Sequence, residues 1–480
     1  MSSLWTHAAQ FPLRSALKQD LSVDAAVIGA GMAGILIAHA LSSRGLRTVV
    51  LEAQTTGSGQ TRNTTAKITA QHGLFYRSLT ERVGSELARQ YARANQEAVD
   101  AYRRLVQSRS ILCDFADCPS YLYTQSRPDL LERELSACRA LGLDVTLTQT
   151  TSLPVPVTAA LRMDGQAMFH PLKFLRAIAQ PLEVYEHTPV LSVRGQELVT
   201  PRGRVTATHI VFACHYPFVN FPGLYFTRMH QERSYVAAVE GAPRLDGMYY
   251  GIDPDGLSFR NAGSLLLVGG GSHRTGMAPR GGQYHELEAR AKQLWPGCRP
   301  VLRWSAQDCM TLDGVPYIGS FSPTQPRWYV ATGFQKWGMS TSMAAAHILS
   351  AMICGEDDPS SDVFSPRRFS LTAAKNLALE SGQAAKHLTI ALLGRPELDL
   401  SDLSPGYGGI VSHQGKKVGA YKDAKGQVYL VEPRCPHLGC QLAWNPEELS
   451  WDCPCHGSRF HYDGSLLNNP AQTGIKKRPR

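Results

Sequence analysis

The first sixty residues combine short apolar runs with a helical pattern of apolar positions. Val23–Ile28 is a mostly apolar run, which is typical of a parallel strand buried on both faces. Between Ile35 and Leu41 the apolar residues recur at helical spacing, and Gly45 marks the end of that helix. Thr48–Leu51 is apolar again. The pattern therefore predicts a strand, a helix and a second strand at the start of the chain.

Two later segments have strand-like patterns. Ser234–Val239 and Leu265–Val268 predict strands within residues 215–300. Gly269–Gly271 follows the second of these without a helical pattern, which predicts a loop. Together with residues 80–155, this region is expected to form a second layer beside the N-terminal unit.

The character of the chain changes after residue 356. Asp357–Arg368 is polar and contains prolines, which predicts a break between domains. Leu371–Leu393 is rich in alanine and leucine at helical spacing and predicts a tethering helix. Pro405 to Gly426 is rich in glycine, and Val428–Val431 is expected to begin an all-β module.

Composition and charge narrow the class of protein. The 480 residues leave room for about three domains, and 43% hydrophobic with 19% charged residues fit a globular protein. No nucleic-acid-binding motif accompanies the net charge of +9, so the charge indicates an acidic electron partner or at most peripheral membrane contact. We expect a cytoplasmic protein, because no apolar stretch of about 20 residues and no signal-peptide pattern occur.

Three glycines and one acidic residue give the N-terminal unit a chemical role. Gly29, Gly31 and Gly34 form a G-x-G-x-x-G motif between strand and helix, and Glu52 ends the second strand. The glycines permit a tight turn and the approach of a pyrophosphate to the helix start, and the carboxylate accepts hydrogen bonds from a ribose. An acidic residue rather than an arginine at position 52 argues against NADP. FAD and NAD both fit this motif.

Three distant segments favour FAD by resemblance. Residues 56–72 (TGSGQTRNTTAKITAQH), 304–319 (WSAQDCMTLDGVPYIG) and 329–341 (YVATGFQKWGMST) resemble, in the same order, elements of D-amino-acid-oxidase-like flavoproteins, the family of sarcosine and glycine oxidases. The resemblance spans about residues 20–360 and implies FAD and a substrate with a C–N bond, such as an amine or amino acid.

The resemblance and the glycine motif together give candidate site residues. The expected cofactor-binding residues are Gly29, Gly31, Met32, Ala33, Gly34, Glu52, Thr61, Arg62, Thr65, Ala66, Val190, Gly333, Gly338, Met339 and Ser340. The candidate catalytic residues are Arg62, Lys67, Tyr250 and Arg260, and for each a surface or packing role stays open.

The most specific pattern lies near the C-terminus. Cys435-Pro436-His437-Leu438-Gly439-Cys440 is followed by Cys453-Pro454-Cys455-His456-Gly457-Ser458. Two Cys/His pairs on two loops fit a Rieske-type [2Fe-2S] cluster, in which two thiolates hold one iron and two imidazoles hold the other. Zinc is the alternative, but the Cys-x-His spacing fits it poorly and two further cysteines would have no role.

These loops resemble those of the Rieske domains of cytochrome bc complexes, over about residues 400–480. The resemblance implies that the ligands are Cys435, His437, Cys453 and His456, that Cys440 and Cys455 form a disulfide, and that Ser458 hydrogen-bonds a cluster sulfur. Phe460 stands where that family has a tyrosine, so a lower reduction potential is expected. Whether Tyr462 compensates stays open.

The expected fold class is α/β followed by β. A doubly wound FAD-binding domain (segments about 20–80, 155–215 and 300–356) interleaves with an antiparallel-sheet substrate domain (about 80–155 and 215–300) within residues 1–360. Residues 361–399 form a linker with a helix, and residues 400–480 form a small all-β Rieske domain.

The combination of cofactors indicates a division of labour. FAD takes up electrons in pairs, and a [2Fe-2S] cluster carries them singly. We therefore expect an amine or amino-acid dehydrogenase that passes electrons from FAD to the cluster and on to an external protein or quinone. Two alternatives remain: an electron-transfer or redox-sensing protein without turnover, and oxidation of a substrate that is not an amine.

Overall fold

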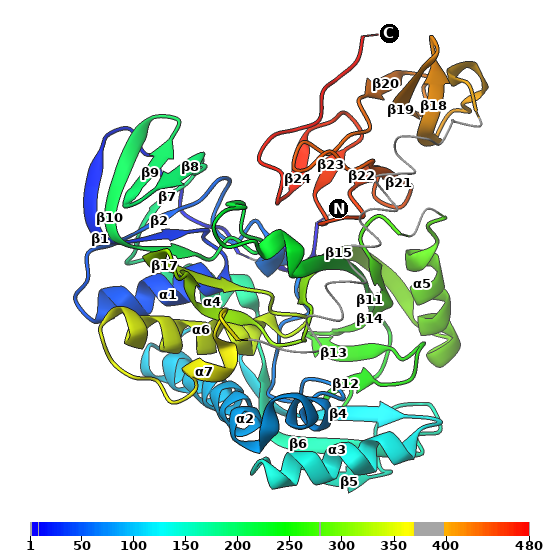
Figure 1. Cartoon of the computed structure of the whole chain (residues 1–480). Helices are drawn as coiled ribbons and strands as arrows, with labels where there is room; N and C mark the ends of the chain where they lie inside the picture. The colour runs from blue at the N-terminus through cyan, green and yellow to red at the C-terminus, as the bar shows by residue number, and fades with distance from the viewer. Residues whose placement is uncertain (1, 8, 278–279, 369–397, 480) are drawn as a thin grey trace.

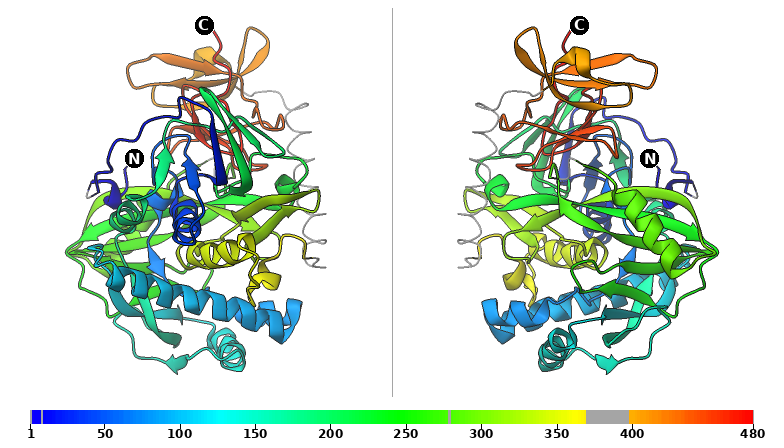
Figure 2. Two further views of the ribbon diagram at one scale, coloured as in Figure 1. Left: turned by 90° about the vertical axis from the view of Figure 1, so that its left-hand side faces the viewer. Right: turned by 90° about the vertical axis from the view of Figure 1, so that its right-hand side faces the viewer.

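The computed structural model describes residues 2–7, 9–277, 280–368 and 398–479. A large N-terminal part contains two sheets and most of the helices, and a smaller all-β C-terminal domain lies on top of it (Figure 1). Both side views in Figure 2 show the same stacking.

The first sheet of the N-terminal part has eight strands and is mainly parallel. Its path is β16-β17-β10-β1-β2-β7, in which the five strands from β17 to β7 run parallel and β16 is antiparallel; β9 pairs with β10 and β8 with β9. The strands are β1 (Leu21–Ile28), β2 (Thr48–Leu51), β7 (Glu183–Tyr185), β8 (Ser192–Arg194), β9 (Glu197–Thr200), β10 (Gly203–Phe212), β16 (Tyr317–Ser322) and β17 (Gln325–Thr332).

The second sheet has nine strands and is mainly antiparallel. Its path is β15-β11-β14-β13-β12-β4-β6-β3 with β5 paired to β6, and β12–β4 is the parallel pair. The strands are β3 (Lys67–Ile68), β4 (Ala116–Thr124), β5 (Thr146–Thr148), β6 (Ala159–Met168), β11 (Met229–Glu240), β12 (Met248–Gly251), β13 (Ser258–Ala262), β14 (Leu265–Arg274) and β15 (Arg299–Thr311).

Helices cover the two sheets. The α-helices are α1 (Met32–Ser43), α2 (Tyr76–Ser108), α3 (Pro128–Ala140), α4 (Pro171–Ala179), α5 (Gln283–Leu294), α6 (Gly338–Ile353) and α7 (Ser361–Phe364), and the short 3-10 helices are Leu4–His7, Gln60–Asn63, Tyr225–Thr227 and Leu400–Asp402. The apolar helices α1 and α6 pack against each other, and their buried side chains join the largest hydrophobic core. Helix α5 packs on β11 and β14 of the second sheet.

The C-terminal domain consists of two small antiparallel sheets. One contains β18 (Gly408–His413), β19 (Lys416–Lys422) and β20 (Val428–Val431), and the other β21 (Ala443–Asn445), β22 (Ser450–Asp452), β23 (Arg459–His461) and β24 (Leu466–Asn468). Trp451 and Phe460 are fully buried in the core of the second of these sheets, together with the four cysteines of the two motif loops.

The fold class expected from the sequence is confirmed, with local corrections. The predicted loop Gly269–Gly271 is wrong, because these residues continue β14, where Gly269 and Gly270 pair with Val236 and Tyr235 of β11. The all-β module begins at Gly408 rather than at Val428. Glycines in these strands leave room for tryptophan rings: a Cβ on Gly408 would lie 2.5 Å from Trp444, and one on Gly419 would lie 2.9 Å from Trp451.

The structure also bears on the predicted FAD-binding segments and on the predicted linker helix. Strands β3, β6 and β15 belong to the nine-stranded sheet, although they fall in segments that were assigned to FAD binding. β15 forms one edge of this sheet, and β3 and β5 both lie at the other, next to β6. The predicted helix Leu371–Leu393 lies outside the described residues.

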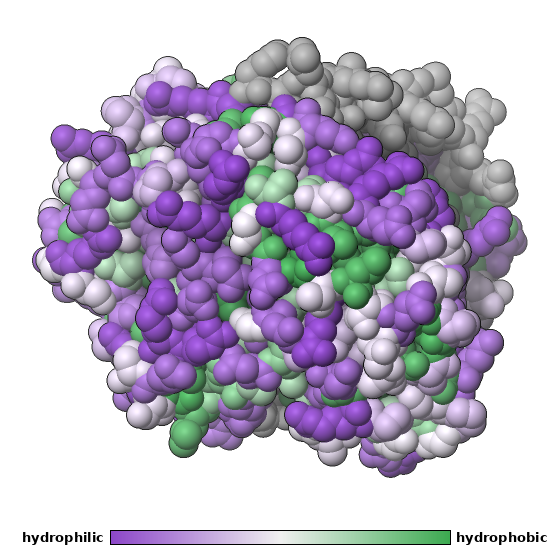
Figure 3. Space-filling view, turned by 90° about the horizontal axis from the view of Figure 1, so that it is seen from below, coloured by the Kyte–Doolittle hydropathy of each residue, from purple (hydrophilic) through white to green (hydrophobic). Residues whose placement is uncertain are grey.

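The surface opposite the C-terminal domain is mainly hydrophilic (Figure 3). Seen from below, hydrophobic colour is confined to scattered patches, the largest near the middle of this face. Among the described residues, no helix has the length and apolar character needed to cross a membrane.

Candidate functional site

A cavity of about 930 Å³ lies where the two sheets of the N-terminal part meet. Residues of both sheets line it, and so do residues of the C-terminal domain. Of the expected cofactor-binding residues, those at the cavity wall are Gly29, Gly31, Met32, Ala33, Glu52, Thr61, Arg62, Thr65, Val190, Gly333, Gly338 and Met339. Gly34, Ala66 and Ser340 lie behind the wall.

The glycine turn has the geometry that a dinucleotide requires. Gly29 has φ +104°, and a Cβ there would lie 2.7 Å from the carbonyl oxygen of Ala213. A Cβ on Gly34 would lie 1.9 Å from the carbonyl oxygen of Gly29, so only glycine lets α1 start this close to the turn. Gly31 has no side chain to cap the start of α1, so apart from the Met32 amide, which bonds to Thr61, this helix end is open to an anion.

Glu52 holds the turn from the neighbouring strand. Its Oε2 accepts from the Ala30 amide at 2.8 Å and its Oε1 from the Gln54 amide at 2.8 Å. Burial raises the pKa of this carboxyl, and the amides that it accepts from act in the opposite direction. Thr61 Oγ1 accepts from the Met32 amide at 2.9 Å and so ties residues 56–72 to the helix start. The glycine turn and the loop of residues 56–72 beside it therefore fit a binding site for FAD.

A second helix start faces the cavity from β17. Gly333 turns the chain with φ +71°, and α6 begins at Gly338 without a side-chain cap. Ser340 points the other way, since its Oγ lies 3.1 Å from Nε2 of the buried His72.

The candidate catalytic residues separate into two groups. Arg62, Lys67 and Tyr250 line the cavity. Lys67 Nζ donates to the Tyr249 carbonyl at 2.7 Å and to Ser258 Oγ at 2.5 Å. Burial, with a smaller effect of Arg260, lowers the pKa of Lys67 to about 7.

Arg260 does not belong to the cavity wall. It is 3% exposed, its Nη1 donates to the carbonyls of Thr65, Ala66 and Phe169, and its Nε donates to that of Asn261. This guanidinium fixes the backbone under residues 65–66. Of the two roles that the sequence left open for Arg260, the structure supports packing rather than catalysis.

Sequence reasoning missed an acidic partner of Lys336 at the cavity. Lys336 Nζ donates to Ser234 Oγ and Ser272 Oγ at 2.9 Å, and lies 3.7 Å from Asp308 Oδ2 and 3.3 Å from Glu232 Oε2. Burial lowers the pKa of Lys336, but the two carboxylates outweigh it and raise the pKa overall. Asp308 lies within the segment 304–319 that was linked to FAD, and its position there was the available signal.

The two cysteine–histidine loops meet in the C-terminal domain. The rings of His437 and His456 are 5.0 Å apart between centroids. The neighbouring thiol of Cys453 lowers the pKa of Cys435. Cys440 and Cys455 form the expected disulfide.

The orientation of the imidazoles fits a cluster. Nδ1 of His437 and Nδ1 of His456 are both buried without a hydrogen-bond partner in the described structure, next to the two free thiols. Two unpaired nitrogens and two thiols match the ligand set of a Rieske cluster. Another grouping of sulfur atoms, Cys440, Cys453 and Cys455, is also close together, but its disulfide leaves one thiol to bind a metal.

Neighbouring residues set the surroundings of these loops. The Ser458 hydroxyl lies beside the Cys435 thiol and lowers its pKa. Its hydrogen bond to a cluster sulfur stays a prediction. Phe460 is fully buried. The Tyr462 ring packs on Tyr429 and Tyr421, with centroids 4.7 and 5.0 Å apart, in the other small sheet. Tyr462 therefore does not replace the missing tyrosine.

Comparison with known proteins agrees with both sites. The family model described as FAD dependent oxidoreductase matches residues 24–352, more than half of the chain. The chain belongs to this family. The model described as Rieske [2Fe-2S] domain matches residues 396–479. The protein is thus an FAD-dependent oxidoreductase domain joined to a Rieske domain, and its cofactors are FAD and a [2Fe-2S] cluster.

One relative matches nearly the whole chain, and two solved structures match about three quarters of it. YhfW of Bacillus subtilis (strain 168), named as a Rieske 2Fe-2S iron-sulfur protein, is 35% identical over 98% of this chain and 96% of its own. Glycine oxidase from Geobacillus kaustophilus matches 73% of this chain and 99% of its own, with a TM-score of 0.61 and 20% identity. L-proline dehydrogenase from P. horikoshii matches 74% and 98%, with a TM-score of 0.62 and 17% identity. The likeness to these two solved structures shows a shared fold.

The Rieske domain docks on the oxidoreductase domain through its cluster loops. His437 Nε2 lies 2.9 Å from Asn220 Oδ1, and the Phe226 ring lies edge-on to both histidine rings. Gln231 Nε2 donates to the His456 carbonyl at 2.7 Å, and Gln307 Nε2 donates to the Gly457 carbonyl at 2.6 Å.

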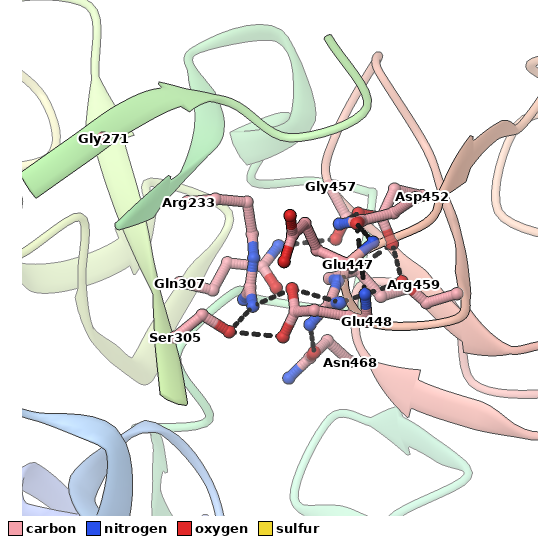
Figure 4. A network of polar contacts seen from close by, with 12 residues as sticks. Arg233, Gly271, Ser305, Gln307, Glu447, Glu448, Asp452, Gly457, Arg459 and Asn468 are labelled. Carbon is pink, nitrogen blue, oxygen red and sulfur yellow. Dashed lines mark hydrogen bonds and ion pairs between the residues drawn. The ribbon is translucent and has the colours of Figure 1, made fainter. Parts of the chain in front are cut away.

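A buried ionic network adds to this interface (Figure 4). Arg233 of β11 contacts Glu448 of the Rieske domain at 2.5 Å, and Glu448 contacts Arg459 at 2.8 Å. Arg459 in turn contacts Asp452 at 2.9 Å, and Ser305 of β15 donates to Glu448. Two positive and two negative side chains balance one another, so the network holds the domains together without net charge.

Proposed function

We propose that the protein is a dehydrogenase of an amine or amino acid that passes electrons from FAD to the Rieske cluster and on to an external one-electron acceptor. When bound, FAD takes up the two electrons released as a C–N bond is oxidised to an imine, which water then hydrolyses. The names of the two structural neighbours, glycine oxidase and L-proline dehydrogenase, support an amino-acid substrate.

One observation carries the proposal: the cluster loop rests on a side chain that also contacts the cavity wall. Gln231 Oε1 lies 3.1 Å from Nε2 of His215, which lines the cavity, and Gln231 Nε2 donates to the carbonyl of His456. The proposed FAD site and the proposed cluster ligand are thus joined by two hydrogen bonds through one residue. This short connection supports transfer within the chain.

The cavity wall carries charges suited to an amino acid. Asp308 offers a carboxylate for a substrate ammonium, and Arg62 offers donors for a substrate carboxylate. Lys336 fixes Asp308 in place through their contact. In this proposal Lys67 accepts a proton, because with a pKa of about 7 a large share of it is the neutral amine at physiological pH.

The alternative of an electron-transfer protein without turnover predicts no space beside the flavin. The cavity continues from the glycine turn to Tyr250 and Lys336, which favours a substrate. The external acceptor, a protein or a quinone, and the cytoplasmic location stay predictions.

The proposal is tested by adding amines and amino acids, one at a time, to the anaerobic holoenzyme. We expect at least one of them to bleach the flavin absorbance and to produce the EPR signal of a reduced Rieske cluster. If 2-hydroxy acids bleach the flavin and C–N compounds do not, the substrate class is wrong. If no compound of either kind does so, an electron-transfer role is favoured.

A further inference from the structure

A continuous segment of the Rieske domain forms part of the cavity wall. Residues 466–469, 471 and 472 line the same cavity as the glycine turn and Glu52. This segment includes β24 and the residues that follow it. The cavity is therefore complete only when the two domains are docked.

Side-chain amides fix this segment beside the nucleotide end of the cavity. Asn469 Nδ2 donates to the carbonyls of Cys214 at 2.8 Å and Tyr216 at 2.7 Å, and Gln231 Nε2 donates to the Asn469 carbonyl at 3.1 Å. Cys214 in turn packs on the dinucleotide turn, since a Cβ on Gly29 would lie 3.0 Å from its Cα. Asn469 is thus anchored next to the turn that receives the pyrophosphate.

A second amide reaches the other side of the nucleotide. Gln472 Nε2 donates to the carbonyl of Val190 at 3.3 Å, and Val190 lines the cavity. A carbonyl oxygen has two lone pairs, so this group can accept from Gln472 and from an adenine amino group at the same time. The family resemblance implies that the backbone near Val190 faces the adenine of FAD, so Gln472 lies at the edge of the expected adenine site.

The chemistry of the segment suits an anionic dinucleotide. Its cavity-lining side chains are apolar at Leu466 and Leu467 and neutral amides at Asn468, Asn469 and Gln472. They cover the cofactor without bringing a negative charge toward the pyrophosphate. The Ala471 amide donates to Ser458 Oγ at 3.0 Å, which links the segment directly to a cluster loop.

We propose that residues 466–472 of the Rieske domain are part of the FAD-binding site and retain the cofactor. FAD binding and domain docking then stabilise each other, because a group that binds only the docked state shifts the equilibrium toward it. FAD leaves only after this segment moves away.

The test measures FAD release from the full-length holoenzyme, followed by the rise in fluorescence of the freed cofactor. We expect Asn469→Ala and Gln472→Ala each to speed release, at least tenfold for Asn469→Ala, which removes two hydrogen bonds. The matched control is Gln427→Ala, an exposed amide of the Rieske domain between β19 and β20. It should release FAD at the wild-type rate.

Cluster content, measured by iron analysis and EPR, separates loss of a contact from loss of the domain fold. Faster release with an intact cluster supports the proposal. Wild-type release from both variants with an intact cluster overturns it. If Asn469→Ala lowers the cluster content, Gln472→Ala alone decides, and an unchanged rate in that variant overturns the proposal. Neither readout depends on the substrate.

Discussion

The substitution Glu448→Gln tests the docking of the two domains most sharply. Glu448 lies between Arg233 and Arg459, whose side chains are 2% and 6% exposed. Arg459 keeps its contact with Asp452 in the variant, whereas Arg233 loses its carboxylate. Removing one partner of a buried ion pair costs about 3–5 kcal/mol because the other charge stays buried and unpaired.

This cost gives two expected magnitudes. At about 1.4 kcal/mol for each factor of ten, the docking equilibrium weakens by about two to three and a half powers of ten. An unfolding entropy of roughly 2.1 cal/mol/K per residue gives about 1 kcal/mol/K for 480 residues, so a concerted melting transition falls by about 3–5 °C. Differential scanning calorimetry of the holoenzyme measures this shift.

Glu356→Gln is the matched control, since Glu356 pairs with Arg44 at the surface, with 58% and 34% of the side chains exposed. Exposed pairs contribute about 0–1 kcal/mol, so its melting temperature should barely change. If both substitutions lower the melting temperature equally little, the buried ion pair does not stabilise the docked domains and the reasoning is refuted.

The pH dependence gives an independent check on the same residue. Burial alone raises the pKa of Glu448, but Arg233 and Arg459 outweigh it and lower the pKa to about 2. A carboxyl whose folded pKa lies below its ordinary value stabilises the fold above that ordinary value, and this stabilisation is lost as the pH falls toward 2. The difference in melting temperature between wild type and Glu448→Gln should therefore shrink below about pH 4.5.

Three further predictions concern the cofactors and the cavity. Cys453→Ser should abolish the Rieske EPR signal and leave the FAD absorbance in place. The control is Cys354→Ser, which changes a free cysteine outside the cluster loops and should keep both signals. If Cys453→Ser retains the EPR signal, Cys453 is not a cluster ligand. Phe460→Tyr should raise the reduction potential in an EPR-monitored titration, because an added hydroxyl group can hydrogen-bond near a cluster sulfur, and a lower potential would contradict this. The rate of flavin reduction by substrate should rise about tenfold from pH 6 to pH 8, since Lys67 loses its proton near pH 7; the same rise in Lys67→Met would exclude Lys67 as the group responsible.

The parts of this site that the sequence predicted are local ones. The glycine turn and the cluster loops each lie within a few consecutive residues, so their spacing alone carries the geometry. Arg260 shows the limit of such reasoning. An arginine in a strand of the substrate layer fits a carboxylate-binding role, but the fold surrounds it with backbone carbonyls instead.

The docking interface could not be predicted in this way. Gln231, Gln307 and Asn469 are neutral amides from three separate strands or turns, and tertiary packing alone brings them together. A weak signal does exist. Gln231 and Arg233 alternate on β11, as Ser305 and Gln307 do on β15, so each pair lies on one face of its strand. Buried polar residues at a spacing of two indicate a partner surface.

Transfer of electrons within one chain is the central claim, and its most direct test is a kinetic one. After anaerobic mixing with an active substrate, the appearance of the reduced cluster is followed by rapid-freeze EPR alongside flavin absorbance over a tenfold range of protein concentration. The account predicts that the cluster becomes reduced after the flavin, with a first-order rate constant that does not depend on protein concentration. A rate constant that rises in proportion to concentration, or a cluster that stays oxidised beside a reduced flavin, would contradict it.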